Sequence, residues 1–272
     1  MGFIFPSLRL TFAIKINTKD LDRKIRVGAV SYLNTKPLLF GIRHSSIIEE
    51  IELKIDYPSR IATMLLQDEI DIGLVPVAII PRMREHYLYT DFCIGSDGPV
   101  ASVGLFSDLP LEEIRRVLLD YQSRTSVALA KILLKDFWKI SPQLVDAEED
   151  FTVAIGGSTA GVVIGDRALT QRKISPFTYD LGQAWKDLTG LPFVYAAWIS
   201  NKPLDPSFVD AFNEANLNGL TQIHEVVKET PFPAYDLDQY YRENVSYHLD
   251  NRKMLGLKAF LSYLQVGALL GV

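Results

Sequence analysis

Residues 25–38 read IRVGAVSYLNTKPL, a short β-branched apolar run followed by polar residues and then a proline. The run at 25–30 predicts a strand, and the pattern over 35–41 predicts a helix that begins after a short polar loop. The same alternation recurs along the next residues, with strands predicted at 51–57 and 70–75 and helices at 59–67 and 77–85. Strands that alternate with helices are typical of βαβ units, so the sequence predicts an α/β fold.

Two further strands are predicted at 91–94 and 100–106. Near-continuous apolar runs such as IGLVP at 72–76 and VGLF at 103–106 favour strands that are covered on both faces, as in an open, mostly parallel sheet.

A second series of strands and helices follows the turn at 107–110. Its predicted strands lie at 116–120, 152–155, 162–164 and 177–180, and its helices at 125–138 and 183–189. After the apolar run at 193–198 the pattern becomes helical, with helices predicted at 205–227, 236–244 and 251–264. We therefore predict a two-lobed architecture: an extension at 1–24, a first lobe at 25–105 plus 195–272, and a second lobe inserted at 106–194.

The composition excludes several classes of function. Twenty-eight basic residues against 33 acidic ones give a net charge of −5 with no basic block, so binding to nucleic acid or to an anionic membrane is not expected. The only cysteine, Cys93, has no partner for a disulfide, and the histidines are scattered without metal-ligand spacing, so no metal site is predicted. Pro6, Arg9 and Lys15 interrupt the apolar N-terminus, which argues against a secretory signal and predicts a cytoplasmic protein.

Three polar segments follow predicted strands, where ligands bind in open α/β sheets. The first contains Ser31, Tyr32, Asn34 and Thr35, which could bind a ligand or only cap the next helix. The second, 95–102, contains Asp97 and Ser102 and could equally be a turn-rich loop. The third places hydroxyls and a guanidinium at a helix start, a suitable cradle for a carboxylate, with Ser123, Arg124, Thr125 and Ser126.

The segment at 26–38 closely resembles the N-terminal signature of the chorismate dehydratase family, which acts in the futalosine route to menaquinone. Further matches occur in the family's order along the chain, at 71–76, 96–102, 123–126, 164–169 and 179–193. The resemblance covers about residues 25–265. It implies a fold similar to the type 2 periplasmic binding proteins, with a ligand cleft between two α/β lobes. It also implies a lyase that removes water from chorismate to give 3-[(1-carboxyvinyl)oxy]benzoate, with no metal or redox cofactor.

The resemblance also implies where the chemistry occurs. Asn34 and Ser102 lie in its best-matched motifs and neither is an ordinary protein base, so our hypothesis is that the enolpyruvyl carboxylate of the substrate takes the proton. Asn34 and Ser102 would hold the ring and the leaving hydroxyl, while residues 123–126 would receive a carboxylate. Asp97 is the alternative base. A non-catalytic solute-binding protein for a small carboxylate is the alternative function, and the sequence predicts no oligomeric state.

Overall fold

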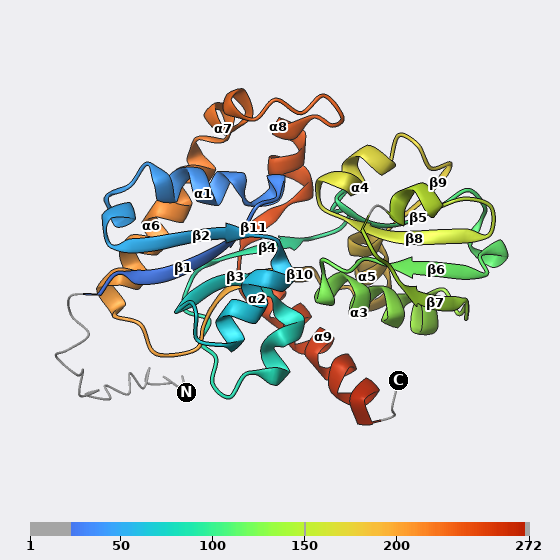
Figure 1. Cartoon of the computed structure of the whole chain (residues 1–272), viewed down its shortest axis with the longest axis horizontal. Helices are drawn as coiled ribbons and strands as arrows, with labels where there is room; N and C mark the ends of the chain where they lie inside the picture. Colours follow the sequence, from blue (N-terminus) through green and yellow to red (C-terminus); the bar gives the residue numbers. More distant parts are fainter. Residues whose placement is uncertain (1–22, 150, 270–272) are drawn as a thin grey trace, which may run out of the picture.

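The computed structural model describes residues 23–149 and 151–269, so all but the end of the extension predicted at 1–24 lies outside the described residues. These residues form two β-sheets that lie side by side, each flanked by helices (Figure 1). The α/β class and the two-lobed architecture predicted from the sequence are confirmed.

The first sheet has the strand order β11-β4-β10-β3-β1-β2. Its strands are β1 (Ile25–Val30), β2 (Ile51–Asp56), β3 (Ile72–Pro76), β4 (Phe92–Ser96), β10 (Phe193–Ser200) and β11 (Ser246–His248). Strand β1 pairs in parallel with β2 and β3, whereas β10 runs antiparallel to β3 and β4. The sheet is therefore parallel on one side and mixed at its centre.

Both faces of the first sheet are covered, as the apolar runs predict. On β3, Ile72 and Leu74 belong to the core cluster that also contains buried residues of α1 (Lys36–Arg43) and α6 (Pro206–Thr221). Val75 belongs to the other cluster, together with buried residues of α2 (Pro58–Leu66). Alternate side chains of one strand thus enter different cores because successive residues point to opposite faces.

The second sheet has the order β7-β6-β8-β5-β9. Its strands are β5 (Val103–Ser107), β6 (Arg116–Leu119), β7 (Gln143–Asp146), β8 (Thr159–Ile164) and β9 (Phe177–Asp180). Its helices are α3 (Arg124–Ile132) with the π-helical turn η6 (Leu133–Phe137), α4 (Asp166–Gln171) and α5 (Leu181–Thr189). Strand β6 pairs in parallel with β7 and β8, and β5 runs antiparallel to β8 and β9.

The chain crosses between the sheets twice. Residues 97–102 connect β4 to β5, and the chain returns from β9 through α5 to β10. The boundary predicted at 105–106 falls inside β5, which lies wholly in the second sheet, so the change of sheet occurs earlier, at 97–102. On the return, β10 already begins at Phe193 in the first sheet.

Helix α9 (Asn251–Leu269) covers the return crossing from below in Figure 1. Its Phe260 makes edge contacts with Phe193 of β10 and with Trp185 of α5, at ring-centroid distances of 5.0 and 6.3 Å. The terminal helix therefore packs against elements from both sides of the crossing.

Several elements differ from the sequence predictions. The strand predicted at 152–155 is wrong, because these residues mostly lie in a 3-10 helix, η7 (Phe151–Ala154). The helix predicted at 205–227 is divided at Gln222 into α6 and α7 (Ile223–Glu229). The segment predicted as a helix at 236–244 is a short turn of α-helix, α8 (Leu237–Gln239), followed by the π-helix η8 (Tyr240–Asn244). Strands β7 and β11 were not predicted.

Candidate functional site

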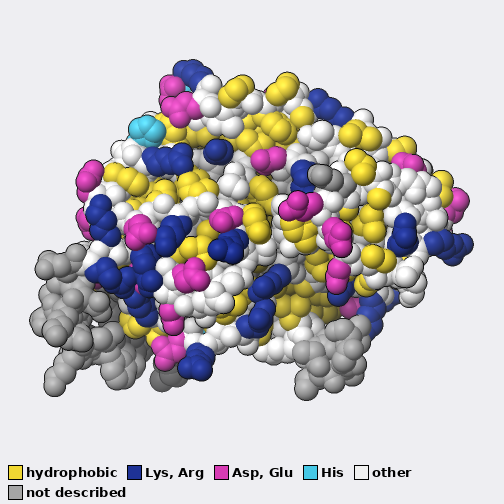
Figure 2. All heavy atoms as spheres, viewed as in Figure 1, with side chains coloured by type: hydrophobic (Ala, Val, Ile, Leu, Met, Phe, Trp, Pro, Cys, Tyr) yellow, Lys and Arg dark blue, Asp and Glu magenta, His cyan; other side chains and the backbone are white. Residues whose placement is uncertain are grey.

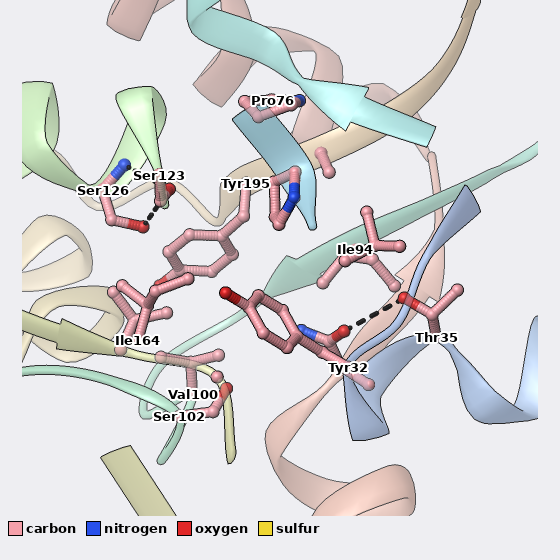
Figure 3. A pocket seen from close by; sticks show the side chains of 16 residues that line it. Tyr32, Thr35, Pro76, Ile94, Val100, Ser102, Ser123, Ser126, Ile164 and Tyr195 are labelled. Atoms are coloured by element: carbon pink, nitrogen blue, oxygen red, sulfur yellow. Dashed lines mark hydrogen bonds between the residues drawn. The ribbon is translucent and has the colours of Figure 1, made fainter. Parts of the chain in front are cut away.

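A pocket lies between the two sheets and draws its walls from both. Its lining residues are Val30, Tyr32, Asn34, Thr35, Pro58, Pro76, Ile94, Val100, Ser102, Val103, Ser123, Ser126, Ile164, Gly165, Tyr195 and Ala196. Figure 3 shows Ser123 and Ser126 on one side, Thr35 and Ile94 on the other, and the rings of Tyr32 and Tyr195 between them. The pocket is mainly apolar, with a small number of hydroxyl and amide groups.

The loop after β1 forms the wall from the first sheet. Tyr32 extends toward the second sheet, where its hydroxyl donates a hydrogen bond to Oε1 of Gln122. The backbone N–H of Leu33 donates to the carboxylate of Asp166 at 3.0 Å. The ring of Tyr32 also lies over Gly165, where φ is +65° and an added Cβ would stand 3.2 Å from three ring atoms. Glycine is therefore required at 165 for both the backbone conformation and the close approach.

The first crossing segment carries Ser102, which is 1% exposed. The residue before it, Ala101, has φ of +62°, a left-handed conformation that is unfavourable for a residue with a Cβ. The carboxylate of Asp180 holds this conformation by accepting the N–H of Val100 at 3.1 Å and of Ala101 at 2.8 Å. Burial raises the pKa of Asp180, against the lowering effect of these bonds. The backbone of the crossing segment at Ser102 is thus fixed by a residue of β9, in the second sheet.

The start of α3 forms the wall from the second sheet. Ser123 is the N-cap residue, and its Oγ accepts the N–H of Ser126 at 3.1 Å and donates to the Ser126 hydroxyl at 2.9 Å. Thr125 is buried, and its Oγ1 accepts the N–H of Ala78 across the two lobes at 3.1 Å. Arg124 does not line the pocket; its buried Nη1 has no hydrogen-bond partner among the described residues, and burial lowers its pKa.

An ion pair between the buried Asp120 and the partly exposed Arg167 supports the same wall. Both carboxylate oxygens of Asp120 accept hydrogen bonds from Nη2 of Arg167, at 2.9 and 2.7 Å, and the same nitrogen donates to Gln122 at 3.0 Å. Burial raises the pKa of Asp120, although the Arg167 cation acts in the opposite direction. Burial also raises the pKa of Tyr32 strongly, which keeps its phenol protonated as the donor to Gln122.

The pocket brings together residues from all three segments predicted from the sequence. Those that line it are Tyr32, Asn34, Thr35, Ser102, Ser123 and Ser126. Ser31 is exposed and lies outside the lining. Asp97 also lies outside it, because its carboxylate forms ion pairs with Lys186 and Arg252, each at 3.0 Å. These ion pairs, with Lys186 as the main cause, lower the pKa of Asp97.

Tyr195 and the apolar lining residues were not predicted from the sequence. Val30, Pro76 and Ile164 are the last residues of β1, β3 and β8, so the rule that ligands bind beyond the carboxyl ends of strands could have found them. Tyr195 lies inside β10, in an apolar run that reads simply as core. Its hydroxyl is 3.4 Å from that of Ser96.

The described residues contain no group of three or more His, Cys, Asp or Glu side chains placed to hold a metal ion. Within the same residues, none of the helices is long and apolar enough to cross a membrane. On the face seen in Figure 2, basic and acidic side chains are interspersed. Cys93 is fully buried, and burial raises the pKa of its thiol to about 12.

Two α/β lobes, two crossing segments and a pocket between the lobes define a periplasmic-binding-protein-like fold. Solved structures agree: a protein of Archaeoglobus fulgidus superimposes with a TM-score of 0.70 at 14% identity, over 92% of this chain and 99% of that one. A Candida albicans protein described as having the generic periplasmic binding protein fold gives a TM-score of 0.63 at 13% identity, over 89% of this chain and 90% of the other.

The sequence comparison identifies the family. Residues 25–266 match the menaquinone biosynthesis family, and the chain belongs to it. A chorismate dehydratase of Thermus thermophilus is 30% identical over 259 residues, which cover 86% of this chain and 93% of the relative. A chorismate dehydratase of Campylobacter jejuni is 26% identical, over 86% of this chain and 95% of the relative.

Proposed function

We propose that this protein is a chorismate dehydratase, a hydro-lyase that converts chorismate to 3-[(1-carboxyvinyl)oxy]benzoate and water. The reaction would feed the futalosine route to menaquinone, in the cytoplasm. The proposal is supported by membership of the menaquinone biosynthesis family and by the two relatives named as chorismate dehydratases. We propose no metal or redox cofactor, because the loss of water from chorismate is redox-neutral and is driven by aromatisation of the ring.

One observation about the site carries the mechanism. None of the described residues that line the pocket is a histidine, an aspartate or a glutamate. The pocket therefore offers hydroxyls, an amide and apolar surface, but no ordinary general base. Chorismate carries its own carboxylate on the enolpyruvyl side chain, close to the ring proton that must be removed. We infer that this carboxylate is the base.

The chain's own residues then bind, orient and exclude water. In the proposed reaction the enolpyruvyl carboxylate takes the proton from the ether-bearing ring carbon, and the electrons of the broken C–H bond form a ring double bond. The neighbouring C–O bond breaks, and the departing oxygen receives the same proton from the carboxylate and leaves as water, so the carboxylate is restored. Asn34 and Ser102 would hold the ring and donate to the leaving oxygen. Tyr32 and Thr35 would contact the substrate from the same loop. The apolar walls would strengthen these hydrogen bonds by excluding water.

The second-lobe wall would receive a carboxylate of the substrate. Ser123 and Ser126 line the pocket at the start of α3, where backbone N–H groups and the helix dipole favour an anion. Arg124 adds positive charge beside them, and its unpartnered Nη1 is available for a charge-assisted bond after a small rearrangement. Ser31, Asp97 and Thr125 have no part in this proposal, because Ser31 is exposed, Lys186 and Arg252 bind the carboxylate of Asp97, and the hydroxyl of Thr125 accepts the N–H of Ala78.

The proposal is tested by incubating the purified protein with chorismate alone and following the products by mass spectrometry. We expect the enolpyruvyl benzoate, one water lighter than chorismate. Asn34→Ala and Ser102→Ala should each lower kcat/KM by about 100-fold or more, because each removes a group that positions the reacting atoms. Ser262→Ala is the matched control, since among the described residues its hydroxyl bonds the carbonyl of Lys258, within α9 and outside the pocket lining.

The alternative function, a solute-binding protein for a small carboxylate, predicts a different result. Chorismate would then bind tightly and be recovered intact. Near-normal turnover by both Asn34→Ala and Ser102→Ala would leave the dehydratase in place but contradict the roles given to these two residues.

A further inference from the structure

A short segment near the C-terminus packs against the two loops that carry Asn34 and Ser102. Residues 240–247 contain the π-helix η8 and most of strand β11, and they lie more than 130 residues from Ser102 along the chain. Three side chains of this segment contact the two loops that carry Asn34 and Ser102. The Tyr247 hydroxyl donates to the carbonyl of Asn34 at 2.9 Å, and the Asn244 amide donates to the carbonyl of Pro99 at 3.3 Å.

The third contact is made by Tyr240, which is fully buried and does not line the pocket. Its phenol donates a hydrogen bond to Oγ of Ser102 at 2.7 Å. Because this bond occupies an acceptor site on Oγ, the proton of the Ser102 hydroxyl remains available as a donor. Rotation of that hydroxyl is restricted by the fixed position of the phenol, so its proton is oriented before a substrate arrives.

The surroundings of Tyr240 keep it in the donor state. Burial raises the pKa of its phenol far above the usual range, while Ser102 and Asn34 act in the opposite direction. The i to i+5 bond from the N–H of Val245 to the carbonyl of Tyr240, at 3.0 Å, closes the π-helical turn; such turns occur frequently at functional sites.

We propose that Tyr240 is a positioning residue for the dehydration: it acts through Ser102, whose hydroxyl it orients toward the leaving oxygen of the substrate. This inference rests on the proposed function and adds to it a residue that never touches the substrate. The neighbouring Tyr241 provides the internal comparison. It is 1% exposed and belongs to the same π-helix, yet its hydroxyl has no hydrogen-bond partner among the described residues.

The test compares Tyr240→Phe with Tyr241→Phe, each of which removes one oxygen and keeps the buried ring. For Tyr240→Phe we expect kcat with chorismate to fall by about 10-fold to 100-fold, with KM changed by less than about 2-fold, because the carboxylate-binding wall at α3 is untouched. Tyr241→Phe should retain the kcat of the wild type. Circular dichroism melting curves of both variants report folding separately.

A double variant separates positioning from general support of the fold. If Tyr240 acts through Ser102, adding Tyr240→Phe to Ser102→Ala should lower kcat no further than Ser102→Ala alone. Multiplication of the two losses, or wild-type kcat in Tyr240→Phe, would overturn the positioning role. Both outcomes require a wild type that converts chorismate. Failure of the wild type to do so would instead overturn the proposed function, and the role of Tyr240 with it.

Discussion

Asp71 immediately precedes β3, and its buried carboxylate contacts three cations. Its side chain is 1% exposed, and its oxygens lie 2.9 Å from Arg23, 2.7 Å from Arg26 and 2.7 Å from Lys202. Hydrogen bonds from these groups outweigh burial and hold the pKa of Asp71 well below its usual range. The residue therefore ties the beginning of β1 to the end of β10 through one charged group.

Replacement of this carboxylate should lower the free energy of unfolding by an amount that depends on pH. Because the pKa of Asp71 is lower in the folded state, its stabilisation is present above the usual aspartate pKa and is lost as the pH falls below it. We expect Asp71→Asn to lower the free energy of unfolding by about 2 to 3 kcal/mol near neutral pH, measured by urea denaturation. The difference from the wild type should shrink in acid.

Glu52→Gln is the matched control, because Glu52 and Lys54 form an exposed pair at 3.5 Å. Exposed pairs contribute little, so this variant should stay within about 1 kcal/mol of the wild type at every pH. A loss in Asp71→Asn that does not depend on pH would contradict the electrostatic explanation.

At the residue scale, the polar residues of the pocket could be predicted from the sequence, but the contacts that each side chain makes could not. Asn34, Ser102, Ser123 and Ser126 were selected as polar residues that follow strands, and all four line the pocket. Asp97 was selected for the same reason, but Lys186 and Arg252 bind its carboxylate. Those cations come from α5 and α9, far along the chain, and no local pattern could show that they meet Asp97.

At the scale of elements, Asp180 joins a helix start to a crossing segment. Its carboxylate caps α5 by accepting the N–H groups of Gly182 and Gln183, and it also accepts those of Val100 and Ala101. Asp180→Ala should therefore lower the free energy of unfolding by about 2 to 4 kcal/mol, since it removes a cap and leaves two further donors without an acceptor. It should also lower kcat, because Ala101 would relax and move Ser102.

Asp205→Ala tests whether the loss of a helix cap alone explains the losses of stability and kcat expected for Asp180→Ala. Asp205 caps α6 through the N–H of Ser207, at a site without a crossing segment. Its replacement should lower the free energy of unfolding by only about 1 kcal/mol and leave kcat unchanged. Equal losses of stability and unchanged kcat in both variants would show that the bonds to residues 100 and 101 contribute nothing. Chemical denaturation and initial rates measure the two effects.

Element predictions succeeded where a strand or helix has a strong apolar pattern of its own. The runs at 25–30 and 72–76 became β1 and β3 because both faces of these strands are buried. Strand β7 was missed since its residues are mostly exposed at the edge of the second sheet. The apolar residues at 152–155 predicted a strand, but β7 and β9 occupy the edges of that sheet, and Val153 is 89% exposed. Whether such a segment becomes a strand depends on the strand it pairs with, and the periodicity of the sequence does not show which strands pair.

At the scale of the whole molecule, a few polar contacts join the lobes around the pocket. Tyr32 bonds Gln122, the N–H of Leu33 bonds Asp166, and Thr125 accepts the N–H of Ala78. One apolar cluster also continues from the first lobe into the second. The two lobes could be predicted from the sequence, but these contacts could not, because each one joins residues more than 45 positions apart.

These contacts define a closed arrangement whose population should depend on the ligand. A substrate that touches both walls binds the closed form better, so it should shift the population toward closure. We expect small-angle X-ray scattering to give a smaller radius of gyration with chorismate than without it.

Gln122→Ala removes the acceptor of the Tyr32 bond and should raise KM by about 3-fold to 10-fold, with a larger radius of gyration in the absence of ligand. Gln183→Ala is the control, because its amide bonds Asp187 within α5. Scattering that is identical with and without chorismate, or a Gln122→Ala variant that behaves like Gln183→Ala, would mean that the lobes do not open and that substrate enters a preformed pocket.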